Sequence, residues 1–225
     1  MGRKKTFDEQ TVIKAAIAVF SEHGYTGTDV GLVCERANIG RSSFYNTFDS
    51  LDALFLRALR EYTGSGTSLR EELRTGTAPA PTLIMHRLGG ELAKQCEDDK
   101  RIGCLSANTA AELGRDVDAV CTILDPDRLA WLETYSIVLE RGQVEGHIRP
   151  DVDTKVHAEL IHSVLAGLRI AARVMPADNV QAQASAFIEA LCTPEGITAL
   201  HSHTAPHTYD GKPPEHLIST EGSAQ

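Results

Sequence analysis

A short run of polar side chains between residues 41 and 47 is well suited to bind another molecule. It combines a guanidinium, three aliphatic hydroxyls, a phenol and an amide: Arg41, Ser42, Ser43, Tyr45, Asn46 and Thr47. Such groups hydrogen-bond to phosphate oxygens and to base edges. In a helix, Phe44 and Phe48 would be buried and the polar groups would remain outward. The run therefore predicts contact with double-stranded DNA.

A second set of polar residues shares one helical face further along the chain. Cys104, Asn108 and Glu112 follow at i, i+4 and i+8, so a helix brings the thiol, the amide and the carboxylate to one side. They are candidates for the polar part of a small-molecule pocket. Three further candidates for the pocket lining are a histidine and two aromatic residues: His86, Trp131 and Tyr135.

Each of these residues also has a plainer role open to it. Free cysteine is commonly a small buried residue, so Cys104 fits a protein core, and Asn108 fits a buried hydrogen-bonding role. Trp131 and Tyr135 lie one helical turn apart, where aromatic pairs more often pack together than recognise a ligand. In the sharper alternative, Cys104 senses electrophiles or oxidants.

Patterns for catalysis, cofactors and metal ions are weak. No base is placed beside a candidate nucleophile and glycine-rich phosphate loops are absent, so we expect neither an enzyme nor a bound cofactor. Five cysteines without a CxxC pair indicate reduced thiols. The histidines at 157, 162, 201, 203 and 207 lack the tight grouping that metal sites favour, which leaves a metal sensor as a weaker alternative.

Charge is distributed unevenly along the 225 residues. The chain carries a formal charge of −9, yet residues 1–50 hold six Lys/Arg and six Asp/Glu and are neutral, with a basic tip at Arg3, Lys4 and Lys5. This asymmetry fits a nucleic-acid-binding end attached to an acidic body. Because long apolar runs and a signal-peptide core are missing, we expect a cytoplasmic protein without membrane contact.

Apolar residues recur at helical spacing and strand-like alternation is missing, so we predict an all-α fold. A capping box at Thr6 and Glu9 predicts the start of the first helix, and Thr28 is the predicted N-cap of the second. Asn38 suits a left-handed turn before a short third helix over 41–48.

A fourth helix is predicted after Ser50, interrupted at Gly64 and Gly66. Later helices are expected at roughly 81–97, 101–113, 117–143, 153–175 and 178–192, with a kink or break at Pro126. From Thr193 onward the composition predicts a mostly disordered tail. The predicted divisions are a DNA-binding domain at 6–60, a ligand-binding and dimerisation domain at 61–192, and a tail at 193–225.

The N-terminal sequence resembles the DNA-binding domain of the tetracycline-repressor (TetR) family over about residues 6–60. Three family elements agree in residue type and spacing, at Phe20, Gly24, Tyr25, at Thr28, and at residues 37–48. One departure is Leu51, which stands where the family usually has a phosphate-binding lysine. The segment 101–113 also resembles a Gly-Cys-Leu…Asn…Glu-Leu stretch of one branch of the family.

The resemblance implies an N-terminal three-helix helix-turn-helix domain and a larger helical domain for ligand binding and dimerisation. Its phosphate contacts would be Thr28, Tyr45 and Thr47, with Lys4 and Lys5 as an arm along the DNA backbone; its base contacts would be Arg41, Ser42, Ser43 and Asn46. The protein would be a homodimeric regulator, by resemblance a repressor, that binds a palindromic operator and is released by a small-molecule effector. The alternative is a regulator that senses electrophiles, redox state or metal.

Two apolar stripes near the C-terminus are predicted to pair two copies of the chain in a four-helix interface. Their residues are Ile161, Val164, Leu165 and Leu168 in the first stripe and Phe187, Ile188 and Leu191 in the second. The alternative is that both stripes form the internal core of a monomer.

Overall fold

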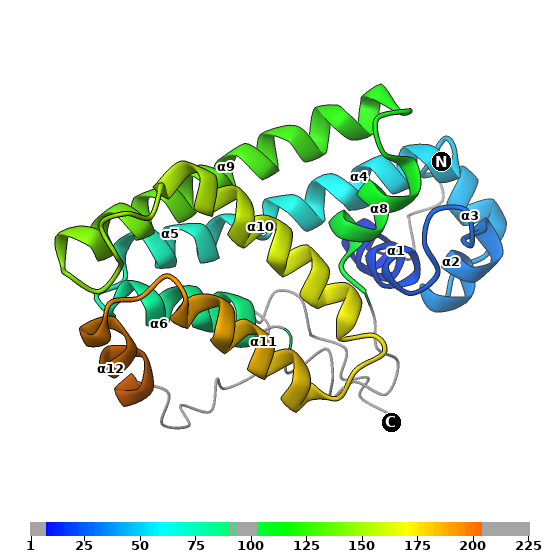
Figure 1. Cartoon of the computed structure of the whole chain (residues 1–225). Helices are drawn as coiled ribbons and strands as arrows, with labels where there is room; N and C mark the ends of the chain where they lie inside the picture. Colours follow the sequence, from blue (N-terminus) through cyan, green and yellow to red (C-terminus); the bar gives the residue numbers. More distant parts are fainter. Residues whose placement is uncertain (1–7, 91, 93–102, 204–225) are drawn as a thin grey trace, which may run out of the picture.

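The computed structural model describes residues 8–90, 92 and 103–203. A compact group of N-terminal helices lies at one end, and the remaining helices extend from it as a longer bundle (Figure 1). The first group contains α1 (Glu9–His23), α2 (Val30–Arg36), α3 (Arg41–Tyr45) and α4 (Leu51–Gly64). Within the described ranges no strand forms beyond an isolated bridge, so the predicted all-α class is confirmed.

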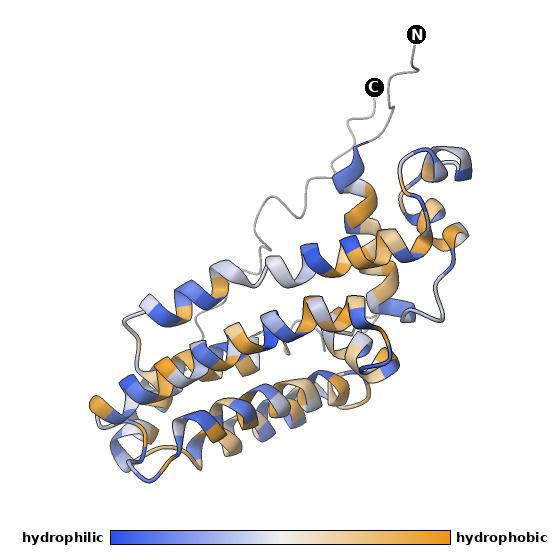
Figure 2. Ribbon diagram, turned by 90° about the horizontal axis from the view of Figure 1, so that it is seen from above, coloured by the Kyte–Doolittle hydropathy of each residue, from blue (hydrophilic) through white to orange (hydrophobic). Residues whose placement is uncertain are grey.

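The bundle is built from the rest of the described chain. Its elements are α5 (Thr67–Thr75), α6 (Ala80–Met85), a π-helical turn η1 (His86–Gly90), α8 (Leu105–Leu113), α9 (Asp118–Val144), α10 (Thr154–Ala171), α11 (Ala177–Glu189) and α12 (Pro194–His203). Hydrophilic and hydrophobic residues alternate along the helices, as amphipathic packing requires (Figure 2).

Side-chain caps fix where the N-terminal helices begin. Asp8, Asp29 and Ser50 each accept a hydrogen bond from a backbone N–H in the first turn of α1, α2 and α4. The predicted N-cap Thr28 is therefore wrong by one residue. The predicted cap Thr6 lies outside the described residues.

The N-terminal helices share their core with the bundle. The rings of Phe20 and Phe55 meet edge to face at 4.9 Å between centroids, and Tyr25 lies 4.8 Å from Phe55. Leu105 of α8 and Val120 of α9 are buried in the same cluster. The start of the bundle is thus packed directly against the N-terminal domain.

The predicted interruption of the fourth helix is confirmed, since α4 ends at Gly64 and α5 begins at Thr67. The predicted break at Pro126 is wrong, because α9 continues through it. Proline has a helical φ and removes one backbone hydrogen bond, and α9 continues on both sides of it. The next residue, Asp127, forms an ion pair with Arg70 of α5 at 2.8 Å and fastens α9 to its neighbour.

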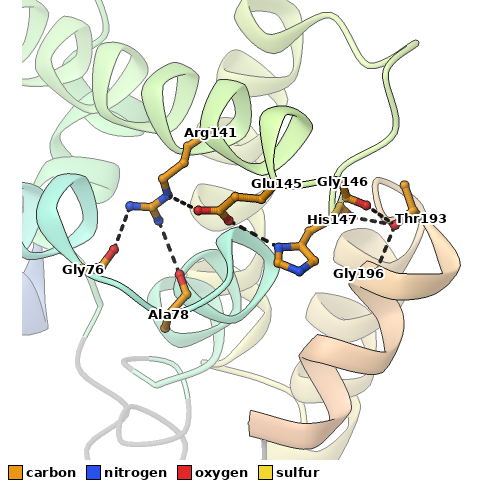
Figure 3. Close-up of polar contacts among 8 residues, drawn as sticks. All are labelled: Gly76, Ala78, Arg141, Glu145, Gly146, His147, Thr193 and Gly196. Atoms are coloured by element: carbon orange, nitrogen blue, oxygen red, sulfur yellow. Dashed lines mark hydrogen bonds and ion pairs between the residues drawn. The ribbon is translucent and has the colours of Figure 1, made fainter.

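A polar network joins three segments at the end of the bundle remote from α1 (Figure 3). Arg141 of α9 donates to the carbonyl of Gly76 at 2.7 Å and pairs with Glu145 at 3.5 Å. The Thr193 hydroxyl donates to the carbonyl of Gly146 at 2.6 Å. Thr193 also caps α12, a helix that falls inside the region predicted as a tail. No helix of the described part is long and apolar enough to cross a membrane.

Replacing Gly196 with alanine is expected to lower the free energy of unfolding by about 1–3 kcal/mol. A Cβ at this position would sit on the carbonyl oxygen of His147, which is backbone and has little freedom to move. Urea titration followed by circular dichroism measures the effect. In the control Gly64→Ala, a new Cβ meets no atom within 4 Å, so stability should stay or rise slightly. Equal stabilities of the two variants would contradict this packing.

Candidate nucleic-acid interface and internal cavity

The turn between α2 and α3 has the backbone that a helix-turn-helix requires. Asn38 has a φ of 51°, which is the left-handed conformation predicted for it. The N–H of Ile39 donates to the carbonyl of Cys34 at 2.9 Å and closes the turn. Burial raises the pKa of the Cys34 thiol, so this cysteine stays protonated and serves as a small packing residue.

Helix α3 presents the polar run on the surface. Phe44 and Phe48 are buried and hold the segment against α1, α2 and α4. The six predicted DNA contacts divide into the exposed Arg41, Ser42, Tyr45 and Asn46 and the half-buried Ser43 and Thr47. The helix ends at Tyr45 rather than at Phe48, because the chain turns there to reach the cap of α4.

Tyr45 is the most prominent apolar group of this face. Its side chain is 57% exposed, and its ring stands edge-on to Phe44 at 5.2 Å. An exposed aromatic side chain held in one orientation suits contact with a flat or charged partner surface.

Thr28 is placed differently from the rest of the predicted contacts. Its side chain is buried, and its hydroxyl donates to the carbonyl of Gly24 at 2.6 Å. A phosphate contact by this hydroxyl would compete with that bond. Lys4 and Lys5 lie outside the described residues.

One face of α8 is bonded to the N-terminal domain. Glu112 accepts hydrogen bonds from the backbone N–H of Tyr25 at 2.8 Å and of Thr26 at 2.6 Å, and a further one from the Thr26 hydroxyl. Asn108 donates to the carbonyl of Ser21 at 3.0 Å. These bonds connect α8 to the end of α1 and the loop before α2. We call Asn108, Glu112 and their partners the α8 clamp.

The clamp depends on the ionised form of Glu112. Partial desolvation raises the pKa of this carboxyl, but the hydrogen bonds from Thr26 and Tyr25 outweigh it, and the net pKa lies below its usual value. Because the folded pKa is depressed, the clamp contributes stability at neutral pH. That contribution is lost as the pH falls through the folded pKa.

A cavity of about 750 Å³ lies beside the opposite face of α8. Its walls come from α4, α5, η1, α8, α9 and α10. Of the six predicted pocket residues, only Trp131 lines it. His86 is exposed elsewhere, and Tyr135 is buried behind Trp131 with the rings stacked at 5.6 Å. Asn108 and Glu112 belong to the clamp instead.

Several cavity residues were missed by sequence reasoning: Arg87, Arg115, Asp125, Asp127, Arg128, His162 and Arg169. A signal for two of them was available. His162 and Arg169 lie on the same helical face as Leu165, inside the stripe predicted to be apolar. Polar residues that interrupt a buried stripe need polar partners, so they point to a polar pocket or an internal hydrogen-bond network.

Cys104 lies at the start of α8, away from the cavity lining but linked to it. Its side chain is 5% exposed. The Tyr62 hydroxyl donates to Sγ at 3.3 Å and the Arg169 guanidinium donates at 3.0 Å. Both partners also line the cavity, so a change at the sulfur would reach the cavity wall directly.

The predicted pairing residues lie mostly inside the single chain. Ile161, Leu165, Leu168, Ile188 and Leu191 are buried in the bundle core, and Val164 and Phe187 are half-buried against it. The stripe prediction needs correction in this respect, because the apolar face of α10 that meets α9 is not available to a partner. The exposed apolar residues of α10 are Val156, Leu160 and Ile170.

Within the described residues, no three side chains of His, Cys, Asp or Glu are grouped closely enough to hold a metal ion.

Both parts of the chain match known protein families. Residues 12–58 match the bacterial regulatory proteins of the tetR family, and residues 92–188 match the tetracyclin repressor-like, C-terminal domain. These matches cover the α2–α3 region and most of the walls of the cavity.

Individual relatives agree with these matches. The chain is 39% identical to the uncharacterized HTH-type transcriptional regulator YezE of Bacillus subtilis (strain 168), over 71% of this chain and 78% of the relative. It is 28% identical to the HTH-type transcriptional repressor DhaR of Mycobacterium sp. (strain GP1), over 68% of this chain and 75% of the relative. A solved structure of a cysteine mutant of the TetR family regulator CifR, complexed with 26-bp double-strand operator DNA, is similar with a TM-score of 0.72 and 26% identity. That similarity covers 84% of this chain and 100% of the CifR chain.

Proposed function

The chain belongs to the tetracycline-repressor family of transcriptional regulators, and we propose that it is a repressor. In this proposal it binds a palindromic operator as a homodimer and is released by a small molecule. The observation that carries the proposal is the exposed polar face of α3, supported from behind by Phe44 and Phe48. It acts in the cytoplasm, where bacterial DNA lies.

DNA binding places α3 in the major groove. Arg41, Ser42, Ser43 and Asn46 face base edges, whereas Tyr45 and Thr47 contact phosphates. Lys4 and Lys5 supply a basic arm along the backbone. Support comes from the exposure of this face and from the operator-bound CifR relative.

Dimerisation uses the outward face of α10. Leu160 is 43% exposed and Ile170 is 55% exposed, although both are large and apolar. Between them Gly167 lies where an added Cβ would meet no atom within 4 Å. A glycine flanked by exposed apolar residues allows a second helix to approach closely, as two-fold helix pairs require.

Release works through α8, which faces the cavity on one side and the N-terminal domain on the other. Ala107 and Ala110 line the cavity, while Asn108 and Glu112 form the clamp. A ligand that fits the cavity better when α8 is displaced shifts the α3 helices away from the spacing that suits DNA. The shift is driven only by the difference in ligand affinity between the two states.

The variant Glu112→Gln is expected to keep the cavity but weaken the coupling between effector and DNA by about 5- to 150-fold. An amide retains one acceptor oxygen but loses the charge that holds three donors. Coupling is measured as the ratio of operator affinities without and with a saturating effector. The control is Glu71→Gln on the exposed surface of α5. A ratio identical to that of the wild type would remove the clamp from the release pathway.

A second candidate function is the sensing of electrophiles or oxidants by Cys104. It is favoured by the two hydrogen bonds that Sγ accepts from Tyr62 and Arg169, since oxidation or alkylation would break both. The variant Cys104→Ser separates the two functions. Cysteine sensing predicts loss of the response to N-ethylmaleimide or hydrogen peroxide, whereas effector sensing in the cavity predicts an unchanged response to the effector.

The proposed function is tested by selecting bound duplexes from a random-sequence pool. The expected product is an inverted repeat whose half-sites lie about one helical turn, roughly 10 base pairs, apart. A metabolite screen on the selected duplex then identifies compounds that release it. Recovery of duplexes without any enriched sequence would contradict the proposal.

A further inference from the structure

We propose that the effector is an organic anion, a carboxylate on an apolar body, held in the cavity beside α8. This inference rests on the proposed function for the biological meaning of the cavity. It goes further in assigning the charge and shape of the ligand.

The first argument is the balance of charge in the cavity wall. Four arginines and two aspartates line it, namely Arg87, Arg115, Arg128 and Arg169 with Asp125 and Asp127. Both carboxylates already have cationic partners. Asp127 pairs with Arg70 at 2.8 Å, and Asp125 with Arg115 at 3.5 Å. Among the described lining residues, arginines therefore outnumber carboxylates around a partly open cavity, and a cleft lined mainly by one sign of charge attracts ligands of the opposite sign.

The arginines converge from three elements. Arg87 belongs to η1, Arg128 to α9 and Arg169 to α10, so no single exposed helix face accounts for them. Arg87 is 4% exposed, and its guanidinium lies 4.3 Å from the centroid of the Trp131 ring. Planar guanidinium groups bind carboxylates through paired hydrogen bonds.

His162 lines the same cavity and its pKa is affected by the same arginines. Desolvation, together with repulsion from Arg169, Arg128 and Arg87, lowers the pKa of this histidine to about 4. The imidazole is therefore neutral at physiological pH. A bound anion would offset part of the repulsion from the arginines and raise the pKa of the imidazole. His162 is thus a built-in reporter for the charge of the ligand.

Much of the remaining lining is apolar, beside the hydroxyls of Tyr62, Thr63, Ser65 and Ser106. Leu69, Leu124, Leu165 and Ile170 contribute to it together with alanines of α8. A volume of about 750 Å³ with a few convergent polar groups is typical of a site for a small organic molecule. An inorganic anion would leave most of this apolar surface unfilled, so the ligand needs an apolar body as well as its carboxylate.

Three probes with the same apolar body and different charge test the inference: 4-phenylbutyrate, 4-phenylbutanamide and 4-phenylbutylamine. Binding to the full-length protein without DNA is measured by calorimetry and by the emission of Trp131, the single tryptophan of the chain. The carboxylate should bind at least about tenfold more tightly than the amide, which corresponds to about 1.4 kcal/mol. The amine should bind most weakly.

Two variants and the NMR signal of His162 test whether the carboxylate binds in this cavity. Arg128→Gln should bring the carboxylate to the affinity of the amide, whereas Arg60→Gln, on the exposed side of α4, should leave both unchanged. In NMR titrations, 4-phenylbutyrate should raise the pKa of His162 and the amide should not. Equal affinities for acid and amide, tighter binding of the amine, or no binding of the acid would overturn the inference.

A failure of this inference can be distinguished from a failure of the proposed function. Tight carboxylate binding without any effect on operator binding would contradict ligand-driven release but leave the ligand class standing. Specific operator binding by a protein that does not prefer the acid would contradict the ligand class alone.

Discussion

Replacement of Arg41 by alanine is expected to lower affinity for the selected operator by about 5- to 150-fold, equivalent to about 1–3 kcal/mol, and to relax the preference at one base pair of each half-site. Arg41 opens α3, is exposed, and carries the only guanidinium of the polar run. Arginine that donates two hydrogen bonds to guanine is the commonest specific contact in the major groove.

Two control variants distinguish recognition of bases from sequence-independent electrostatic attraction to the DNA backbone. Lys4→Ala should weaken binding equally for all duplexes and flatten the dependence of affinity on salt, because it removes a phosphate contact. Arg60→Ala removes an arginine from the exposed surface of α4 and should change neither quantity. A footprinting titration in which Arg41→Ala keeps both the affinity and the base preference would remove Arg41 from DNA recognition.

Replacement of Leu160 by glutamate is expected to give a folded monomer with operator affinity lowered by about 100- to 10,000-fold. Leu160 is 43% exposed in the single chain, so a charge there costs the protomer little. In the proposed dimer this face of α10 packs against its symmetry-related copy, so the introduced carboxylates would be buried without partners. Each half-site would then be bound by an independent protomer.

Light scattering and calorimetry with operator DNA measure this effect, and circular dichroism confirms that the helices persist. Leu129→Glu is a matched control, since Leu129 is 56% exposed on α9 rather than on α10. That variant should remain dimeric and bind DNA normally. A Leu160→Glu protein that stays dimeric would place the interface elsewhere.

The helix-turn-helix could be predicted from sequence because its signals are local. The left-handed turn at Asn38 and the burial of Phe44 and Phe48 each depend on a few neighbouring residues, and the structure confirms all three. The start of α2 was misplaced by one residue because Thr28 and Asp29 are both good capping residues. Only the geometry decides between them.

The cavity was predicted poorly because its walls come from segments far apart in sequence. Periodicity placed Cys104, Asn108 and Glu112 on one face of α8, and their contacts confirm that they point toward neighbouring helices. Periodicity does not tell which neighbour that face meets. The face packs on α1 and α4, and the cavity lies on the other side.

The sequence also did not show which side of α10, the helix of the first predicted pairing stripe, faces the core of the chain. Helix α10 is apolar on more than one side, and sequence alone does not separate the side that meets α9 from the side left for a partner. Ile161 and Leu165 proved to be core residues, whereas Val156 and Leu160 are exposed.

The most direct test of the central claim, that this protein reads a specific DNA sequence, is the ratio of two affinities measured at about 150 mM salt. The first is for the duplex obtained by selection, and the second is for a duplex of the same length and composition in shuffled order. Specific regulators bind their sites about 10³- to 10⁷-fold more tightly than other DNA, so we predict a ratio of at least about 1,000. Equal affinities for the two duplexes would contradict the account.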